Sequence, residues 1–224
     1  AESPGATVVL TAHTGIGTSA NPLDLHVRRL AATTTDSDQY LNEQDDLESL
    51  DLQAGSGQIV LTAQGAVQDD DAATDVVAAG LTLTSTSAGT LTSRLQTQVD
   101  SLTATLTDGG RFLSEADGLT LEAVAASAPG ADVVRTSVTG DILVRQLSVT
   151  NLASLEAQAG AIQRTGAAPQ TILAADLELS GATGVGRAAD PLRTQVARLE
   201  AAGGAGGVFV QNTGDLQIGG LAST

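Results

Sequence analysis

The chain has 224 residues, of which 42% are apolar, so it can bury a substantial core. Its 26 acidic residues outnumber its 10 basic residues, and the net charge of −16 argues against binding to nucleic acid or to anionic membrane surfaces. The lack of cysteine excludes a disulfide scaffold and a thiolate metal site, and no apolar run approaches the ~18 residues of a membrane span.

The apolar residues are almost entirely Leu, Val, Ile and Ala. Methionine and tryptophan are absent, and the aromatic residues are Tyr40, Phe112 and Phe209. A compact globule normally draws much of its core energy from large rings. A core of small and branched aliphatic side chains suits thin, repeated layers better, and short alternations of Thr, Ser, Val and Leu favour strands over helices.

An internal repeat organises the chain, because residues 17–47, 89–119 and 186–216 align without a gap. Each copy begins with a glycine, carries apolar residues at the same offsets and contains one of the three aromatic residues. The copies lie 72 and 97 residues apart, close to three and four times ~24, and repeats of this length indicate a solenoid. The shared positions are Gly17, Gly89 and Gly186; Leu23, Leu95 and Leu192; Val27, Val99 and Val196; Leu30, Leu102 and Leu199; Tyr40, Phe112 and Phe209; and Leu47, Leu119 and Leu216.

Two stretches near the starts of the modules, residues 21–32 and 190–201, fit either a strand or a short helix. Asn21-Pro22 and Asp190-Pro191 resemble helix starts, with an N-cap residue before a proline, and apolar residues follow at helical spacing. The second copy has Ser93-Arg94 instead and continues in a Thr-rich, strand-like setting. We therefore expect a strand after an Asx-Pro bend, with a short helix decorating the solenoid as the alternative.

Short alternating runs between Gly, Asp and Ser corners predict further strands at residues 58–62, 141–144 and 208–210. Together with the repeat, they predict an all-β fold, a right-handed parallel β-helix (β-solenoid) with roughly 20–24 residues per coil and about ten coils. We expect residues 1–224 to form one continuous segment that belongs to a longer repeat array.

One acidic stretch is a candidate calcium loop. Asp69, Asp70 and Asp71 follow a glycine-containing turn, in a segment expected to be a long loop between strands. Carboxylate oxygens suit Ca²⁺, although the Gly-Gly-x-Gly-x-Asp pattern of calcium-binding roll repeats is absent. A solvated acidic loop is the alternative.

No catalytic residue is predicted. His13 and His26 lie in no recognisable motif, and no pattern for zinc or dinucleotide binding is complete. Paired carboxylates such as Asp45-Asp46 are plentiful, and Glu43 matches Glu115 between copies, but the third copy has Asn212 at that position. Solenoid enzymes that cleave glycans typically place acids beside basic residues and aromatic rings, and this chain has no lysine and almost no rings.

The run of residues 15–23, its partner 184–192 and the stretch Glu115-Ala116-Asp117-Gly118-Leu119 resemble repeats of very large bacterial exoproteins, the filamentous-haemagglutinin-like and autotransporter-like adhesins. The resemblance implies a right-handed β-helix, export to the bacterial cell surface or the extracellular space, and a role in adhesion, aggregation or biofilm formation. It implies no catalytic residue.

These observations lead to a structural or adhesive stalk segment as the expected function, with no enzyme activity and no cofactor other than calcium. The expected partners are a host or neighbouring cell surface or a matrix polysaccharide, with end-to-end self-association as a further contact. Nucleic acid binding and membrane insertion of this segment are not expected. The alternatives are a self-assembling extracellular filament or sheath subunit and a glycan-active β-helix enzyme.

Overall fold

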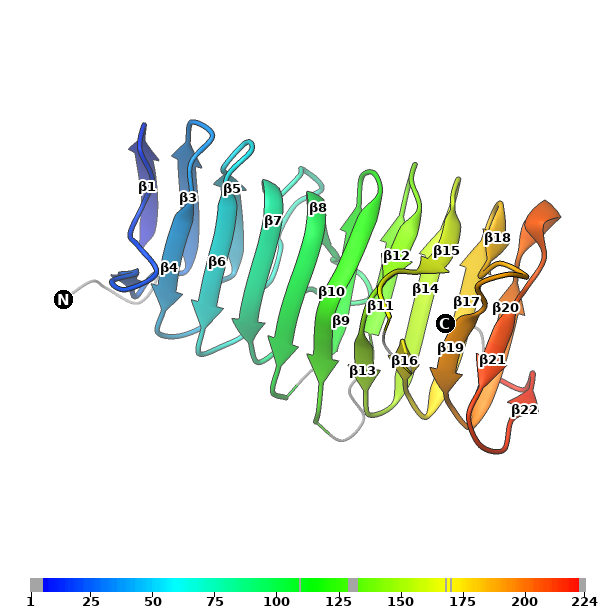
Figure 1. Ribbon diagram of the computed structural model, residues 1–224. Helices are drawn as coiled ribbons and strands as arrows, with labels where there is room; N and C mark the ends of the chain where they lie inside the picture. Colours follow the sequence, from blue (N-terminus) through cyan, green and yellow to red (C-terminus); the bar gives the residue numbers. More distant parts are fainter. Residues whose placement is uncertain (1–5, 109, 129–132, 168, 170, 222–224) are drawn as a thin grey trace.

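The computed structural model describes residues 6–108, 110–128, 133–167, 169 and 171–221. Its strands wind around a common axis and stack in parallel, forming a β-solenoid of about nine turns (Figure 1). This arrangement confirms the predicted all-β, parallel solenoid, and the number of turns is close to the predicted ten. In the described part of the chain, the only helical segment is a single 3-10 turn, Gly204–Gly206.

One face of the solenoid is a ladder that runs the whole length of the described chain. Its members pair in parallel, each with the strand of the next coil. In order, they are β1 (Thr7–Ala12), β3 (Arg29–Thr34), β5 (Ser49–Gln53), β7 (Val76–Ser85), β8 (Leu95–Leu106), β9 (Arg111–Glu115), β11 (Val133–Ser137), β14 (Leu152–Ala157), β17 (Asp176–Gly181), β20 (Arg198–Ala202) and β22 (Gln217–Ile218).

The second face is one ladder in the N-terminal half and two in the C-terminal half. The N-terminal ladder consists of strands that pair in parallel from one coil to the next. In order, they are β2 (Leu23–Leu25), β4 (Gln39–Glu43), β6 (Gln58–Ala63), the second halves of β7 and β8, and β10 (Leu119–Ala126). After β10 the face divides at a bend. The two branches are β12 (Ile142–Val144), β15 (Ala161–Arg164) and β18 (Gly184–Val185), and β13 (Leu147–Val149), β16 (Ile172–Leu173), β19 (Leu192–Gln195) and β21 (Val210–Asn212).

The strand registers give the length of each coil. Arg29 pairs with Ser49, which is a coil of 20 residues, and Leu52 pairs with Val76, which is a coil of 24 residues. A shorter spacing of 18 residues recurs at the same position of each module, where Leu23 pairs with Leu41, Leu95 with Leu113 and Leu192 with Val210. With a rise of ~4.8 Å per coil, about nine coils make a rod roughly 40 Å long.

The core lies between the faces and consists of Leu, Ile, Val and Ala. Alternate residues of each strand point inward, as the exposed–buried alternation of β3 and β6 shows. Equivalent inward positions stack into columns along the axis; Ile59, Leu81, Leu102 and Leu121 are partners in successive coils, and all are fully buried. Tyr40 is only half-buried and Phe209 is 37% exposed, so these two aromatic residues contribute little to the core, while the Phe112 side chain lies outside the described part.

The glycine that opens each repeat module starts the same outward turn. Gly17, Gly89 and Gly186 have φ angles of 65°, 66° and 64°, a region that favours glycine. A four-residue turn follows each of them and is closed by a main-chain hydrogen bond between its first and last residues. These bonds run from Thr18 N to Asn21 O (3.0 Å), from Thr90 N to Ser93 O (2.7 Å) and from Arg187 N to Asp190 O (3.2 Å).

The segments 21–32 and 190–201 form strands, so the preferred prediction is confirmed and the helical alternative is wrong. Pro22 and Pro191 follow the last residue of the outward turn, and β2 and β19 begin directly after them. The apolar residues that suggested a helical period are divided between two strands on different faces. Leu23 belongs to β2 and Leu30 to β3, and a bend at residues 26–28 separates them.

Candidate functional site

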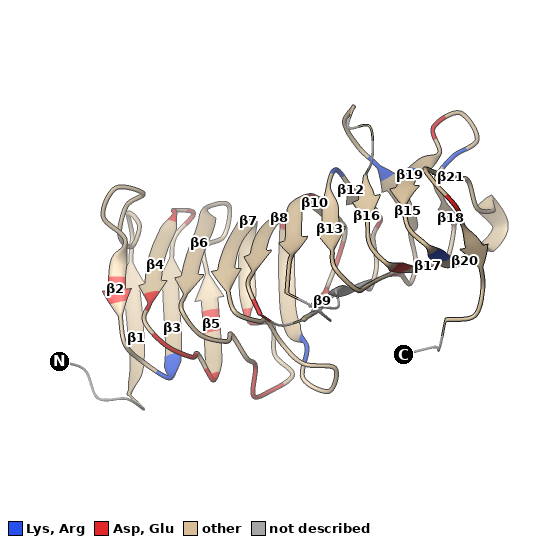
Figure 2. Ribbon diagram, turned by 90° about the horizontal axis from the view of Figure 1, so that it is seen from below, with Lys and Arg blue, Asp and Glu red and all other residues tan. Residues whose placement is uncertain are grey.

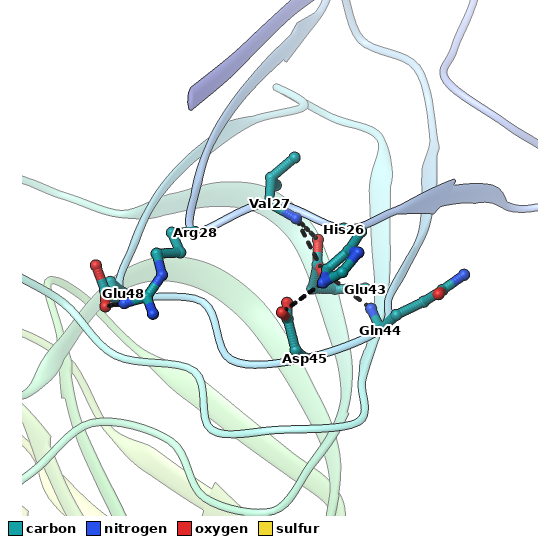
Figure 3. A network of polar contacts seen from close by, with 7 residues as sticks. All are labelled: His26, Val27, Arg28, Glu43, Gln44, Asp45 and Glu48. Carbon is teal, nitrogen blue, oxygen red and sulfur yellow. Dashed lines mark hydrogen bonds and ion pairs between the residues drawn. The ribbon is translucent and has the colours of Figure 1, made fainter. Parts of the chain in front are cut away.

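The glutamates that match between modules are built into the coil. Glu43 is fully buried at the end of β4, and its two carboxylate oxygens accept hydrogen bonds from Val27 N at 3.1 and 3.2 Å. One of these oxygens also accepts from Gln44 N at 2.9 Å. Figure 3 shows this carboxylate directed at the bend that contains Val27. Glu43 therefore supplies the acceptor that the strand ladder cannot supply at the bend.

The same arrangement recurs in the other two modules. Glu115 accepts from Val99 N at 3.1 Å and from Thr97 Oγ1 at 2.8 Å. The amide oxygen of Asn212 accepts from Val196 N at 3.0 Å, and its nitrogen donates to Val196 O at 3.1 Å. Either a carboxylate or an amide thus satisfies this position, because the requirement is an oxygen acceptor and not a negative charge.

Burial makes the ionised form of these glutamates unfavourable. Desolvation raises the pKa of Glu115 to about 7, although the hydrogen bonds from Thr97 and Val99 act in the opposite direction. Desolvation also raises the pKa of Glu43, and the neighbouring Asp45 carboxyl adds to the increase. Perturbed pKa values often mark functional sites, but here the cause is burial, and the buried carboxylates bind the main chain of the bend.

Several aspartates at the corners hydrogen-bond to the next coil. Asp36 accepts from Ser56 N, Asp38 from Gln58 N, Asp46 from Ala66 N and Asp141 from Ala161 N, at distances of 2.7 to 3.0 Å. Each of these contacts joins residues 20 positions apart, which is one coil. Figure 2 shows acidic residues distributed along the rod. The corner aspartates therefore add side-chain hydrogen bonds between successive coils to the main-chain hydrogen bonds of the strand ladders.

The histidine in the first module lies at the surface. His26 Nε2 is 2.8 Å from Asp45 Oδ2, and both side chains are about 40% exposed (40% and 41%). Figure 3 shows this pair beside the buried Glu43, with a second exposed pair in which Arg28, from the same bend as His26, contacts Glu48. Exposed pairs of this kind add little stability.

The predicted calcium loop lies between Val67 and β7, and the structure divides its three aspartates. Asp69 and Asp71 come together with Asp75, and one carboxylate oxygen from each lies within 4.8 Å of the other two. Asp70 points elsewhere and pairs with Arg29 at 2.6 Å. The hypothesis of a metal site in this loop stays a prediction, with Asp75 in the place of Asp70.

Asp75 has the most perturbed carboxyl of this cluster. Burial, together with the neighbouring Asp69 and Asp71 carboxylates, raises the pKa of Asp75 to about 8, although the hydrogen bond from Gln96 N acts in the opposite direction. Two buried oxygens nearby, Asp69 Oδ2 and Gln96 Oε1, have no hydrogen-bond partner. Buried polar atoms are rarely left unsatisfied. Asp45 Oδ1 beside Glu43 is a further case, but in the 68–75 loop the unsatisfied oxygen belongs to a cluster of three carboxylates.

Asp75 could not be identified from the sequence as part of the cluster. It lies outside the acidic run and immediately precedes the apolar strand β7. Only the path of the loop, which leaves the coil after Val67 and returns at Val76, places its carboxylate beside those of Asp69 and Asp71. In the sequence, Asp75 is only a single acidic residue before an apolar strand, and such a residue does not by itself indicate a metal ligand.

Open recesses occur beside the aromatic residues of the first and third modules. One is lined by Gly17, Thr18 and Tyr40 with Asp36 and Asp38, and the other by the equivalent Gly186, Arg187 and Phe209. Their equivalence follows from the outward turn that each module repeats. The first recess is acidic and the second carries an arginine, so the modules repeat the shape of the recess but not its charge.

No family model, curated protein or solved structure matches this chain. Among the residues that the structure describes, no helix has the length and apolar character needed to cross a membrane.

Proposed function

We propose that this chain is a structural or adhesive stalk segment of a secreted bacterial surface protein that acts in cell adhesion, aggregation or biofilm formation. The observation that carries the proposal is the use of the repeated polar residues. Glu43, Glu115 and Asn212 hold the bends through main-chain hydrogen bonds, and the corner aspartates join one coil to the next. The repeated polar chemistry thus maintains a rod, and the repeats contribute length.

The charge of the surface supports the same proposal. A chain with 26 acidic and 10 basic residues presents a surface of mostly one sign, which keeps neighbouring rods apart in solution. Charged edges also discourage the edge-to-edge association to which open strand ladders are prone. The proposed location is the bacterial cell surface or the extracellular space, and the proposed partners are a host or neighbouring cell surface or a matrix polysaccharide. We propose no enzymatic activity.

Immunogold electron microscopy of the producing cells, with antibody against this chain, tests the proposal. We expect label along structures that project from the cell surface, and no label on cells from which the gene has been deleted. Label confined to the cell interior would contradict a stalk. Label spread through the medium without fibres would also contradict it and would favour the glycan-active alternative, which release of reducing sugar from polysaccharides would then test.

A second measurement separates an adhesive segment from a spacer. Beads coated with the purified chain are mixed with cells or with immobilised matrix polysaccharide, and beads coated with an unrelated protein of similar net charge serve as the control. Retention above this control indicates an adhesive segment. Retention equal to the control indicates a spacer, and the ligand-binding part of the stalk would then lie in another segment.

A further inference from the structure

The loop at residues 68–75 brings three carboxylates together at one edge of the solenoid. One oxygen each from Asp69, Asp71 and Asp75 lies within 4.8 Å of the other two, and Asp69 and Asp75 are only 7% and 3% exposed. Oxygen ligands lie 2.3–2.6 Å from a bound Ca²⁺ ion, so two ligands of one ion are at most about 5 Å apart. The three oxygens are therefore close enough to share a single ion.

Main-chain hydrogen bonds orient each of these carboxylates. Asp69 Oδ1 accepts from Asp71 N at 2.9 Å, Asp71 Oδ1 from Ala73 N at 2.6 Å, and Asp75 Oδ2 from Gln96 N at 2.7 Å. These bonds use one oxygen of each side chain and leave the second oxygen outside them. The loop thus fixes the orientation of the ligands through its own backbone, as a preorganised site requires.

An unsatisfied buried oxygen is the independent observation that points to a ligand. Asp69 is more than nine-tenths buried, and its Oδ2 has no hydrogen-bond partner. A charged oxygen that is buried and unpaired costs more free energy than an unpaired neutral group. Gln96, whose N–H holds Asp75, also has a buried side-chain oxygen without a partner. A bound cation would satisfy these oxygens, to which no protein group in the described residues donates.

We infer that Asp69, Asp71 and Asp75 bind a divalent cation, for which Ca²⁺ is the best match. Ca²⁺ accepts 6–8 oxygen ligands in irregular geometry, whereas Mg²⁺ demands a nearly ideal octahedron. Asp71 is exposed, so water can complete the coordination shell from that side. The inference does not depend on the stalk function, because it rests on this loop alone.

The position of the loop predicts the effect of the ion on stability. Asp70 pairs with Arg29 from β3, and Ser93 Oγ from the outward turn of the second module donates to Asp69 O at 2.8 Å. The loop is thus attached to a preceding and a following coil. An ion held by Asp69, Asp71 and Asp75 fixes the loop against both coils and stabilises the folded chain through its preferential binding to the folded state.

The experiment is a thermal melt of the purified chain, which is first treated with a chelator and then titrated with CaCl₂ up to about 10 mM at constant ionic strength. This concentration range covers the dissociation constants of extracellular calcium modules, which are about 10⁻⁴–10⁻³ M. Isothermal titration calorimetry measures the stoichiometry. We expect a saturable rise in Tm with one Ca²⁺ per chain. Asp71→Asn, an exposed change compatible with folding, should weaken binding at least tenfold, and Asp75→Asn should abolish it.

Asp70→Asn is the matched control, because Asp70 is in the same acidic run but pairs with Arg29; its affinity for Ca²⁺ should stay within about twofold of the original chain. A Tm that does not respond to Ca²⁺ would overturn the inference. An equal response in the Asp71→Asn and Asp75→Asn variants would also overturn it, because the ion would then be screening the overall charge. An equal response to MgCl₂ would overturn the assignment to Ca²⁺.

Discussion

The Glu115 carboxylate accepts a hydrogen bond from the main-chain N–H of Val99, which lies 16 residues earlier in the chain, at a distance of 3.1 Å. Burial raises the pKa of Glu115 to about 7, whereas a glutamate in an unfolded chain has a pKa of about 4.3. The folded chain therefore binds more protons than the unfolded chain between these values. The contribution of protonated Glu115 to the free energy of unfolding is fully present below about pH 4.3 and is lost as the pH rises through about 7.

Glu115→Gln should remove this pH dependence, because the amide oxygen keeps the acceptor and has no proton to lose. The equivalent Asn212 shows that an amide works at this position. We expect the free energy of unfolding of the variant, measured in urea, to exceed that of the original chain at pH 8 by on the order of 3 kcal/mol or less. At pH 4.5 the two free energies should be similar. An equal pH dependence in both proteins would show that Glu115 does not titrate on unfolding.

Gly186→Ala should destabilise the third module. A Cβ at this position would lie 2.1 Å from Phe209 O and 2.9 Å from Leu192 N, and the φ of 64° already disfavours alanine. We expect a loss of at least about 1–3 kcal/mol in urea unfolding, since the strain of the left-handed conformation alone has this cost. Gly214→Ala is the control: its φ of 93° is also positive, but no atom lies within 4 Å of the added Cβ. Equal losses would assign the effect to φ alone.

Leu102→Ala should cost about 2–5 kcal/mol, because the change removes a side chain from the centre of the column that continues into the coils on both sides. Leu91 lies in the outward turn of the same module and is 55% exposed, so Leu91→Ala should change the free energy of unfolding by less than about 0.5 kcal/mol. Urea unfolding followed by circular dichroism measures both. A small loss for Leu102→Ala would mean that the layers relax to fill the cavity.

Asp141→Ala should weaken the contact between two successive coils. The Asp141 carboxylate accepts from Ala161 N at 2.7 Å, and the alanine leaves that N–H without its acceptor. We expect a loss of about 1–3 kcal/mol, and faster exchange of the Ala161 amide hydrogen than in the original chain. Asp141→Asn keeps an oxygen acceptor and should recover most of the stability. If the asparagine variant is as unstable as the alanine variant, charge and not hydrogen bonding is the important property.

The fold was predictable because the repeat is visible in the sequence. Gly17, Gly89 and Gly186 align at the same repeat position, and they adopt the same φ at the same outward turn. Most of the apolar residues that follow them are inward positions of successive coils, and Leu216, which is 37% exposed, is an exception. The division of the second face after β10 was not predictable, because the bend at residues 145–146 consists of Arg145 and Gln146, without the glycine or proline that usually indicates a turn.

The sequence was less informative about individual side chains. It placed Asp69 and Asp71 in a candidate site, but the pairing of Asp70 with Arg29 depends on two segments 41 residues apart that meet only through the stacking of coils. The burial of Glu43 and Glu115 was also not evident, since a glutamate is rarely fully buried and normally indicates a solvated position. The asparagine at the equivalent position of the third module, Asn212, indicated that the negative charge is dispensable. The main-chain N–H that this side chain binds lies 16 residues earlier and is identified only in the folded coil.

Each strand of this solenoid pairs only with the coils immediately before and after it. Under tension along the axis, the coils are therefore loaded in series, and the weakest interface opens first. A coil of about 20 residues adds ~4.8 Å to the folded rod but roughly 65–70 Å when pulled straight. The rod consequently resembles a tether with reserve length, which dissipates work one coil at a time while the remaining coils stay folded.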